Sequence, residues 1–402
     1  KILYLNYSNS TVQLMRISDV ARGLRLQDHQ VDLIHMDRNV QAQLRRAQKQ
    51  STDAYATTKK HLSFSRFLPR FLAVLAGEPK RFYYNLRMFF DELRILRKSD
   101  HDFVLVRPGI CWSIFVSTYL LKKKVVYDTD GPLLEAYQSP NCNLPKHYLK
   151  MEGFWVRQWK AMSVISNEMK RFYQAKGGDP NRIFTMPNGI NSEIFHPEVD
   201  ASEIKKRYKL EDKLVIGFMG NLESWHGLPG LLQVFPHLAE RYENLRMLLV
   251  GFHLDWDNLA ESADKRFLKY KDRVICTGRI PFDLMPKHLK AIDIFILPYQ
   301  KLDFFYFSPV KLFESMGVGC AVVAADIGQI PEVVEDGKDG LLFPPGEYQE
   351  MTKRIELLIN DPELRKEMGE VAAKKIRNNY LWELTTKSII DAYNYTYGDT
   401  KG

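Results

Sequence analysis

The chain has 402 residues, of which 45% are hydrophobic and 26% charged. This length suits two domains, and the composition excludes a disordered, collagen-like or repeat protein. The net charge of +8 is unevenly spread, because residues 1–190 hold 30 basic against 16 acidic side chains and the remainder holds 27 against 33. The first half is therefore the one expected to meet an anionic partner.

The cysteines and the apolar runs indicate in which cellular compartment the protein is expected. The four cysteines lie far apart without a zinc-type spacing, which fits a reducing environment. The chain opens on a strand-like segment without a signal peptide, and its longest apolar run, of about 12 residues, is shorter than the ~20 that span a bilayer. We expect a cytoplasmic protein, either free or bound peripherally to the inner face of the membrane.

Short apolar runs bounded by polar or turn residues recur along the whole chain. Runs of this kind are typical of strands buried on both faces of a parallel sheet. Six lie in the first half and six in the second: 2–6, 31–35, 103–107, 124–128, 162–166, 183–187, 214–219, 245–251, 273–278, 293–298, 320–326 and 340–344.

Amphipathic stretches alternate with these runs. Apolar residues recur at helical spacing between Leu228 and Ala239 and again between Leu364 and Ala372. The alternation predicts an α/β protein with two Rossmann-like doubly wound domains. We place the domains at 1–190 and 191–378, followed by a C-terminal helical segment at 379–402, with the ligand site in the cleft between the domains.

Residues 59–98 interrupt the alternation. They combine ten Lys and Arg with eight Phe and Tyr and only three acidic residues. Basic and aromatic side chains together suit a helix lying on an anionic membrane, but they also suit a core helix whose Arg stems cover apolar surface. Nucleic acid is not expected, because no recognition motif accompanies the charge.

The triplet Asp128-Thr129-Asp130 follows the run at 124–128. Hard metal ions prefer carboxylate ligands, so this triplet is a candidate metal site. In the fold that uses such a triplet the metal binds in a domain at the start of the chain, whereas the features of a phosphate site lie in the second half of this chain. We therefore expect no metal.

Two segments of the second half have the features of phosphate sites. In residues 216–235 a strand leads to Gly220, and Gly227 precedes an amphipathic helix. In residues 304–346 Ser308 is expected as an N-cap and Pro309 as the first helical residue, so that free N–H groups and Lys311 bind an anion. Glu314 can then accept hydrogen bonds from a ribose diol.

These segments resemble the donor half of a family 4 retaining glycosyltransferase with the GT-B fold. The resemblance extends over residues 188–380 through MPNGINSEIF, GNLESWHG, VICTGRIP, SPVKLFESMGVGCAVVAADIGQIPEVV and DGKDGLLFPPG. The first half is similar more loosely, through DFVLVR, KVVYDTDGP and AMSVISNEMKRF. The resemblance implies an acceptor domain at 1–190, a nucleotide-sugar domain at 191–378 and a C-terminal helix that crosses back to the first domain.

The resemblance also implies roles for single residues. Glu314 contacts the ribose, the N–H groups of Val310 and Lys311 contact the diphosphate, and Arg279 and Ile280 lie beside the base. The other expected donor residues are Gly220, Asn221, Trp225, Gly227, Tyr306, Ser308 and Pro309.

Several positions depart from the family pattern. Tyr306 replaces the first of two glutamates, and Asn221 and His226 replace an Arg and a Lys that bind the diphosphate. Lys311 and His226 are expected to supply the missing positive charge, as in a subgroup with a WHG-type loop. Asp130 aligns near a histidine that approaches the transferred sugar, so Asp130, Lys311 and His226 are the candidate catalytic residues.

The sequence therefore predicts a metal-independent, retaining hexosyltransferase without a cofactor. Its donor is expected to be a UDP-sugar rather than a GDP-sugar, and its acceptor a hydroxyl of a glycan, lipid-linked or small molecule. A cell-envelope polysaccharide or glycolipid is the expected product class. Two alternatives remain: a GT-B nucleotide-sugar epimerase and an inactive nucleotide-sugar binding protein.

Overall fold

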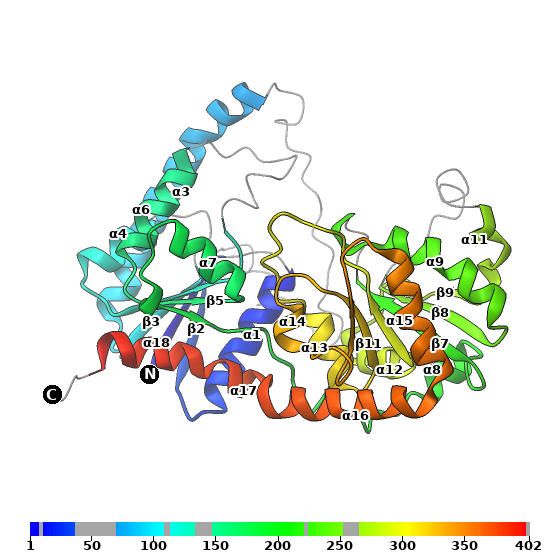
Figure 1. The fold of residues 1–402 in the computed structure, drawn as a ribbon. Helices are drawn as coiled ribbons and strands as arrows, with labels where there is room; N and C mark the ends of the chain where they lie inside the picture. The colour runs from blue at the N-terminus through cyan, green and yellow to red at the C-terminus, as the bar shows by residue number, and fades with distance from the viewer. Residues whose placement is uncertain are drawn as a thin grey trace. The chain divides into compact units, whose positions relative to one another are not determined.

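The computed structural model describes residues 1–7, 11–36, 70–107, 113–132, 147–220, 224–251 and 265–398 (Figure 1). The chain forms two compact units. Unit 1 comprises Lys1–Met186 and Thr386–Gly402, and unit 2 comprises Pro187–Thr385.

Unit 1 is built on a six-stranded parallel sheet with the order β2-β1-β3-β4-β5-β6. Every apolar run predicted in this half forms one of its strands. The sheet is continuous through Tyr4, which pairs with Leu33 on one side and Leu105 on the other. The strands are β1 (Ile2–Asn6), β2 (Val31–His35), β3 (Phe103–Arg107), β4 (Val125–Thr129), β5 (Met162–Val164) and β6 (Ile183–Thr185).

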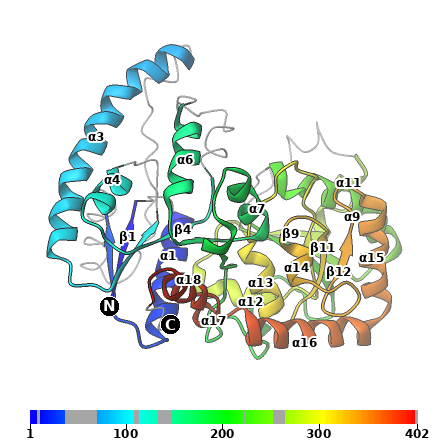
Figure 2. The ribbon, with the colours of Figure 1, turned by 60° about the vertical axis from the view of Figure 1, so that its left-hand side comes forward.

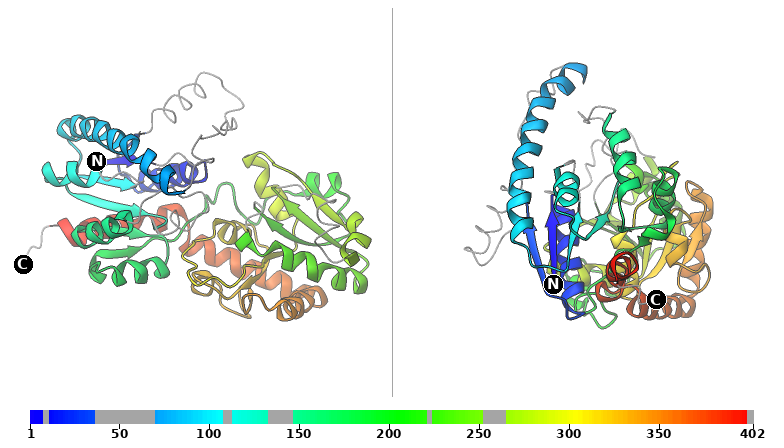
Figure 3. Two further views of the ribbon diagram at one scale, coloured as in Figure 1. Left: turned by 90° about the horizontal axis from the view of Figure 1, so that it is seen from above. Right: turned by 90° about the vertical axis from the view of Figure 1, so that its left-hand side faces the viewer.

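Helices flank this sheet, and the described segments of unit 1 include a 29-residue helix (Figure 3). Helix α7 begins where the Ser166 side chain accepts a hydrogen bond from the N–H of Met169, an N-cap that satisfies one free donor. The described α-helices are α1 (Thr11–Arg25), α3 (Arg70–Lys98), α4 (Ser113–Leu120), α6 (His147–Gln158), α7 (Asn167–Ala175) and α18 (Lys387–Tyr397).

Unit 2 is built on a second six-stranded parallel sheet, with the order β12-β11-β10-β7-β8-β9. This is the strand order of a Rossmann fold, which reverses direction between β7 and β10. The six runs predicted in this half are confirmed as β7 (Leu214–Met219), β8 (Leu245–Val250), β9 (Val274–Cys276), β10 (Ile294–Leu297), β11 (Ala321–Ala325) and β12 (Leu341–Phe343).

Amphipathic helices cover the second sheet. In α9, Leu231, Leu232, Phe235 and Leu238 are buried at the predicted helical spacing. Helix α16 begins at Pro362, and Asp361 caps it by accepting from the N–H of Leu364. The described α-helices of unit 2 are α8 (Ser202–Arg207), α9 (Leu228–Arg241), α11 (Lys265–Lys269), α12 (Met285–Lys290), α13 (Val310–Gly317), α14 (Ile330–Val333), α15 (Tyr348–Asn360), α16 (Pro362–Asn379) and α17 (Trp382–Thr385).

Helices follow one another at the C-terminal end of the described chain (Figure 2). Helix α16 ends at Asn379, with Tyr380 as its C-cap, and α17 and α18 follow. Helix α18 packs within unit 1, where the Tyr397 hydroxyl donates to the carbonyl of Val125 and Tyr393 stacks on Phe103 at 4.5 Å. The chain thus returns to the sheet in which it began. None of the described helices is long and apolar enough to span a membrane.

Candidate active site

Three glycines follow consecutive strands at the carboxyl edge of the unit 2 sheet. Gly220, Gly251 and Gly278 come after β7, β8 and β9 and have φ values of 141°, 105° and 66°. Only glycine adopts such angles at little cost. These turns bring bare backbone to the edge where open parallel sheets bind ligands, next to the point where the strand order reverses.

Gly227 fixes the next loop against this edge. Its φ is 70°, and a Cβ at this position would overlap the carbonyl oxygen of Pro298, which follows β10. The N–H of Gln300 also donates to the carbonyl of Trp225 at 3.3 Å. The loop before α9 is therefore bound to the end of β10, and this places His226 beside the start of α13.

Lys311 from α13 meets His226 at this place. Its Nζ lies 3.3 Å from Nε2 of His226, and a protonated lysine donates in this contact. The same Nζ lies 4.7 Å from the ring centroid of Phe218, and a Cβ on Gly220 would stand 2.5 Å from it. A lysine and a histidine that lie 85 residues apart in sequence thus meet at the strand-order reversal.

The surroundings of Lys311 change its titration. Burial lowers the pKa of its ammonium to about 7, and the nearby carboxylate of Glu314 opposes this only in part. Near neutral pH the group is therefore divided between charged and neutral forms. A diphosphate placed beside it favours the charged form, so anion binding and proton uptake are coupled at this site.

The start of α13 differs from the prediction in one respect. The helix begins at Val310 and Pro309 occupies the N-cap, so Ser308 is not the cap. Its hydroxyl instead accepts from the backbone N–H of Asn188 at 2.9 Å, and the Asn188 amide donates to the carbonyl of Ser308 at 2.7 Å. Ser308 holds the helix entry against the 187–190 segment. The N–H groups of the first turn, from Val310 onward, are not used by a cap side chain.

The remaining predicted donor residues lie in different parts of unit 2. Glu314 is buried on α13, one turn after Lys311. Arg279 is exposed and Ile280 half-buried, directly after Gly278, and Tyr306 is buried. Asn221 lies outside the described residues. The structure therefore brings together Gly220, Trp225, His226, Gly227 and Lys311.

The sequence reasoning named Trp225 and Tyr306 as donor residues but missed three other aromatic side chains of this region, Phe218, Tyr299 and Phe307. Trp225 and Phe307 stack at 6.1 Å with an interplanar angle of 9°, and Tyr306 lies 4.3 Å from Phe307. Tyr299 contacts His226 from the end of β10. The run of aromatics at 304–307 indicated an aromatic cluster, but only the pairing of distant segments shows that the rings of Phe218 and Tyr299 lie near the Lys311 ammonium.

Asp130, the candidate near the sugar, lies in unit 1 after β4 and forms an ion pair with Arg107. Asp128 is fully buried, binds Arg16 at 2.7 Å and accepts from the Tyr4 hydroxyl at 2.8 Å. Burial would raise the pKa of Asp128, but the arginines outweigh it and hold the pKa below its usual range. Both carboxylates of the triplet thus pair with arginines. Over the described residues no cluster of three His, Cys, Asp or Glu side chains could hold a metal ion.

The chain matches two family models that together extend over most of its length. Residues 200–375 match the model described as glycosyl transferases group 1, and residues 15–194 match the model of glycosyltransferase family 4.

Individual relatives agree with these models. An uncharacterized glycosyltransferase of Methanocaldococcus jannaschii is 26% identical over 75% of this chain and 76% of its own length. A GDP-mannose-dependent phosphatidylinositol monomannoside mannosyltransferase of Mycolicibacterium smegmatis is 28% identical over 55% of this chain and 58% of its own length. This chain thus aligns with little more than half of that second relative.

A solved structure shows the same fold. Anabaena HepE, crystallised with UDP and glucose, has a TM-score of 0.67 at 17% identity and covers 97% of this chain, with 98% of its own chain aligned. The two parallel six-stranded sheets are those of a GT-B protein. The chain belongs to family 4 of the glycosyltransferases, a family of retaining hexosyltransferases with the GT-B fold.

Proposed function

We propose that this protein transfers a hexose-type sugar, with retention of configuration, from a nucleotide-diphosphate sugar to a hydroxyl of a glycan, lipid-linked or small-molecule acceptor. The observation that carries the proposal is the meeting of Lys311 and His226 beside Gly220, at the strand-order reversal of unit 2. Backbone without side chains, a free helix start, a lysine and a histidine meet at this point, and such an arrangement suits a diphosphate.

The donor is positioned by the residues that surround this point. We assign the diphosphate to Lys311, His226 and the N–H groups of Val310 and Lys311, and the ribose to Glu314. The base lies beside Arg279 and Ile280. A UDP-sugar is our preferred donor, supported by the complex of HepE with UDP and glucose. The mannosyltransferase named for GDP-mannose makes a GDP-sugar the alternative.

The chemistry follows from the leaving group. When the glycosidic bond breaks, the diphosphate gains negative charge, and fixed N–H dipoles with Lys311 and His226 stabilise that charge more than they stabilise the intact donor. The acceptor hydroxyl then attacks from the face that the diphosphate leaves and passes its proton to a departing phosphate oxygen. Asp130 is our candidate for a polar group near the sugar.

The first test is a thermal-shift series with UDP, GDP and their glucose and mannose conjugates, since a ligand of the native state raises its stability. UDP-sugars should raise the melting temperature, and wild type should then form a glycoside from the stabilising donor and an acceptor mixture. Free sugar or epimer formed without any acceptor would favour the epimerase. Donor binding with neither hydrolysis nor transfer would favour an inactive binding protein.

A second part of the proposal concerns the membrane, and it is carried by α3. Phe82, Leu86 and Phe90 recur every four residues along one side of this helix, and Tyr83 lies next to them. Phe82, Tyr83 and Phe90 are 61%, 67% and 62% exposed. An exposed aromatic stripe on a basic helix suits the surface of an anionic bilayer. Membrane contact would suit a lipid-linked acceptor. The relative named as a phosphatidylinositol monomannoside mannosyltransferase supports this proposal, because its name gives a lipid as the acceptor.

Flotation with vesicles tests the membrane contact. Wild type should float with vesicles that contain phosphatidylglycerol, and the double variant Phe82→Ser, Phe90→Ser should stay at the bottom of the gradient. Tyr395, 61% exposed on α18, provides the matched control as Tyr395→Ser. Equal flotation of all three proteins would contradict the role of α3, and no flotation at low salt would favour a small soluble acceptor.

A further inference from the structure

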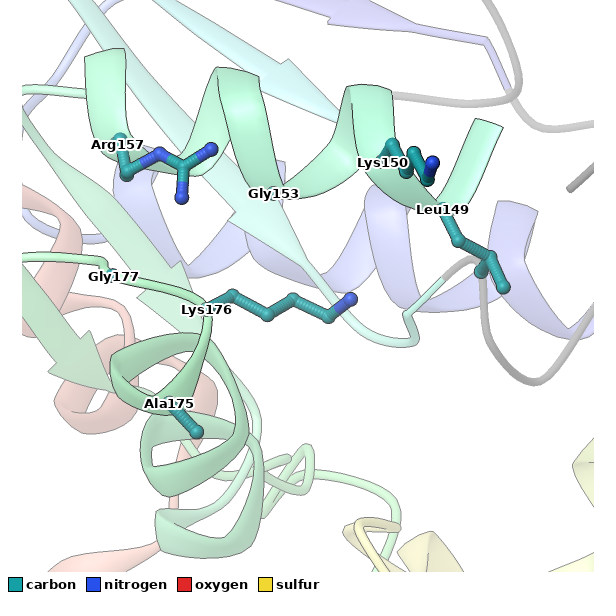
Figure 4. A pocket seen from close by; sticks show the side chains of 7 residues that line it. All are labelled: Leu149, Lys150, Gly153, Arg157, Ala175, Lys176 and Gly177. Carbon is teal, nitrogen blue, oxygen red and sulfur yellow. The ribbon is translucent and has the colours of Figure 1, made fainter. Parts of the chain in front are cut away.

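A cavity of about 520 Å³ opens between α6 and the end of α7 in unit 1 (Figure 4). We call it the α6–α7 cavity. Its volume falls in the range of small-molecule sites. It is lined by Leu149, Lys150, Gly153, Arg157, Ala175, Lys176 and Gly177.

Gly153 keeps this cavity open. It lies inside α6, where a glycine destabilises the helix relative to alanine. Among the described residues, no atom outside the helix's own backbone lies within 4 Å of the position that a Cβ would take, so their packing does not require a glycine here. The residue lines the cavity, and any larger side chain would project into it. The effect of the glycine is therefore to leave this space open among the described residues.

Gly177 shapes the opposite wall. Its φ is 91°, and a Cβ at this position would stand 3.0 Å from Cγ and Cδ of Arg157. The backbone after α7 thus passes directly beneath the stem of Arg157. This contact holds the guanidinium at the edge of the cavity, and Lys176 extends alongside α6 from the other side (Figure 4).

The charge of the lining is strongly positive. Lys150, Arg157 and Lys176 are cationic and no lining residue is acidic. Among the described residues, the Glu152 carboxylate contacts this lining: its Oε2 lies 3.5 Å from Nζ of Lys176 and its Oε1 accepts from the Tyr173 hydroxyl at 3.2 Å. One carboxylate for three cations leaves an excess of positive charge facing the cavity.

The cavity extends along α6 from its first turn to its last turn. Helix α6 ends before β5 begins, and the Lys176–Gly177 turn comes shortly before β6 begins. Arg157 and the Lys176–Gly177 turn therefore lie toward the amino ends of these strands, whereas Leu149 and Lys150, in the first turn of α6, lie toward the carboxyl ends, where ligands of open parallel sheets bind. Unit 1 alone lines the α6–α7 cavity, so a proposal for it is independent of the donor assignment in unit 2.

We propose that the α6–α7 cavity binds an organic phosphate ester. Three cationic groups select an anion, arginine and lysine both suit phosphate, and the volume exceeds the needs of inorganic phosphate alone. The ester is either the headgroup of an anionic phospholipid or a soluble sugar or glycerol phosphate. Phe154, 51% exposed on α6, adds an apolar contact at the cavity's own helix.

The test compares a filled cavity with an open one. Gly153→Leu should close the cavity and Gly153→Ala should fill it only in part, and both should keep or raise the melting temperature. Arg157→Gln removes a cation, and Lys160→Gln removes one from an exposed residue that does not line the cavity. Binding is measured by calorimetry with glycerol 3-phosphate and glucose 1-phosphate, and by sedimentation with phosphatidylcholine vesicles with and without phosphatidylglycerol.

We expect Gly153→Leu and Arg157→Gln to weaken binding at least tenfold and Lys160→Gln to leave it unchanged. If these two variants lose the binding of glycerol 3-phosphate or glucose 1-phosphate that wild type shows, the ligand is a soluble ester. If the two variants lose only the binding to vesicles that contain phosphatidylglycerol, the ligand is a lipid headgroup. The aromatic stripe of α3 is intact in every variant, so a change in that stripe cannot explain such a loss. Equal binding by Gly153→Leu and wild type, or no binding of either kind by wild type, would overturn the proposal.

Discussion

The titration of Lys311 gives the sharpest test of the donor site. Its pKa is lowered from 10.5 to about 7. At 1.36 kcal/mol for each pKa unit, burial makes the charged form less favourable by about 5 kcal/mol relative to water. A bound diphosphate compensates for this cost and raises the pKa again. Above pH 7 the free protein must therefore take up a proton to bind the donor, and each pH unit should weaken apparent affinity about tenfold.

The assay is isothermal titration with UDP-glucose between pH 7 and 8.5 in buffers of different ionisation enthalpy. The diphosphate of this donor is esterified at both ends and does not titrate near neutral pH, so proton uptake reports on the protein. Wild type should take up close to one proton for each ligand at the upper end of this range. Lys311→Met should bind more weakly with no uptake, and Lys311→Arg, which stays charged, should bind without pH dependence.

His226 is the matched control because its Nε2 contacts the same Lys311 ammonium. His226→Gln should weaken binding but leave the proton uptake of Lys311 in place. If Lys311→Met takes up the same proton as wild type, the titrating group is a different one. The proposed role of Lys311 at the diphosphate would then be wrong.

Three further predictions concern the same chain. Glu314→Ala should raise the KM for the donor at least tenfold and shift the melting temperature by only a few degrees, and unimpaired turnover would contradict the ribose assignment. Gly220→Ala should cost about 1–3 kcal/mol through its φ of 141° and should displace Lys311, so that kcat/KM falls. Gly337→Ala has the strain of a φ of 79° but no atom within 4 Å, and should retain activity. Burial raises the pKa of Glu92 from 4.5 to about 7, so the folded chain holds a proton that the unfolded chain releases. As the pH rises from 4.5 to 7, the free energy of unfolding measured in urea should therefore fall by about 3 kcal/mol more for wild type than for Glu92→Gln. If the two proteins show the same dependence of unfolding free energy on pH, Glu92 is not the group that titrates.

Local sequence patterns determined the elements of this fold. A strand buried on both faces needs a continuous apolar run, so each of the twelve runs could be identified without knowledge of its neighbours. The glycine that starts α9 could be predicted in the same way, because Gly227 has the positive φ that its position requires. These properties depend on residues close together in sequence.

Contacts between distant segments were decided only by the tertiary structure. Lys311 meets His226 across 85 residues, and Ser308 binds Asn188 across 120, which removes it from the helix cap where its local sequence had placed it. The α6–α7 cavity likewise forms from two helices that no local pattern connects. The periodicity of apolar residues in the sequence indicates which face of a helix or strand is buried. It does not indicate which other helix or strand covers that face. The order of the strands sets those neighbours, and with them the surroundings of each charge.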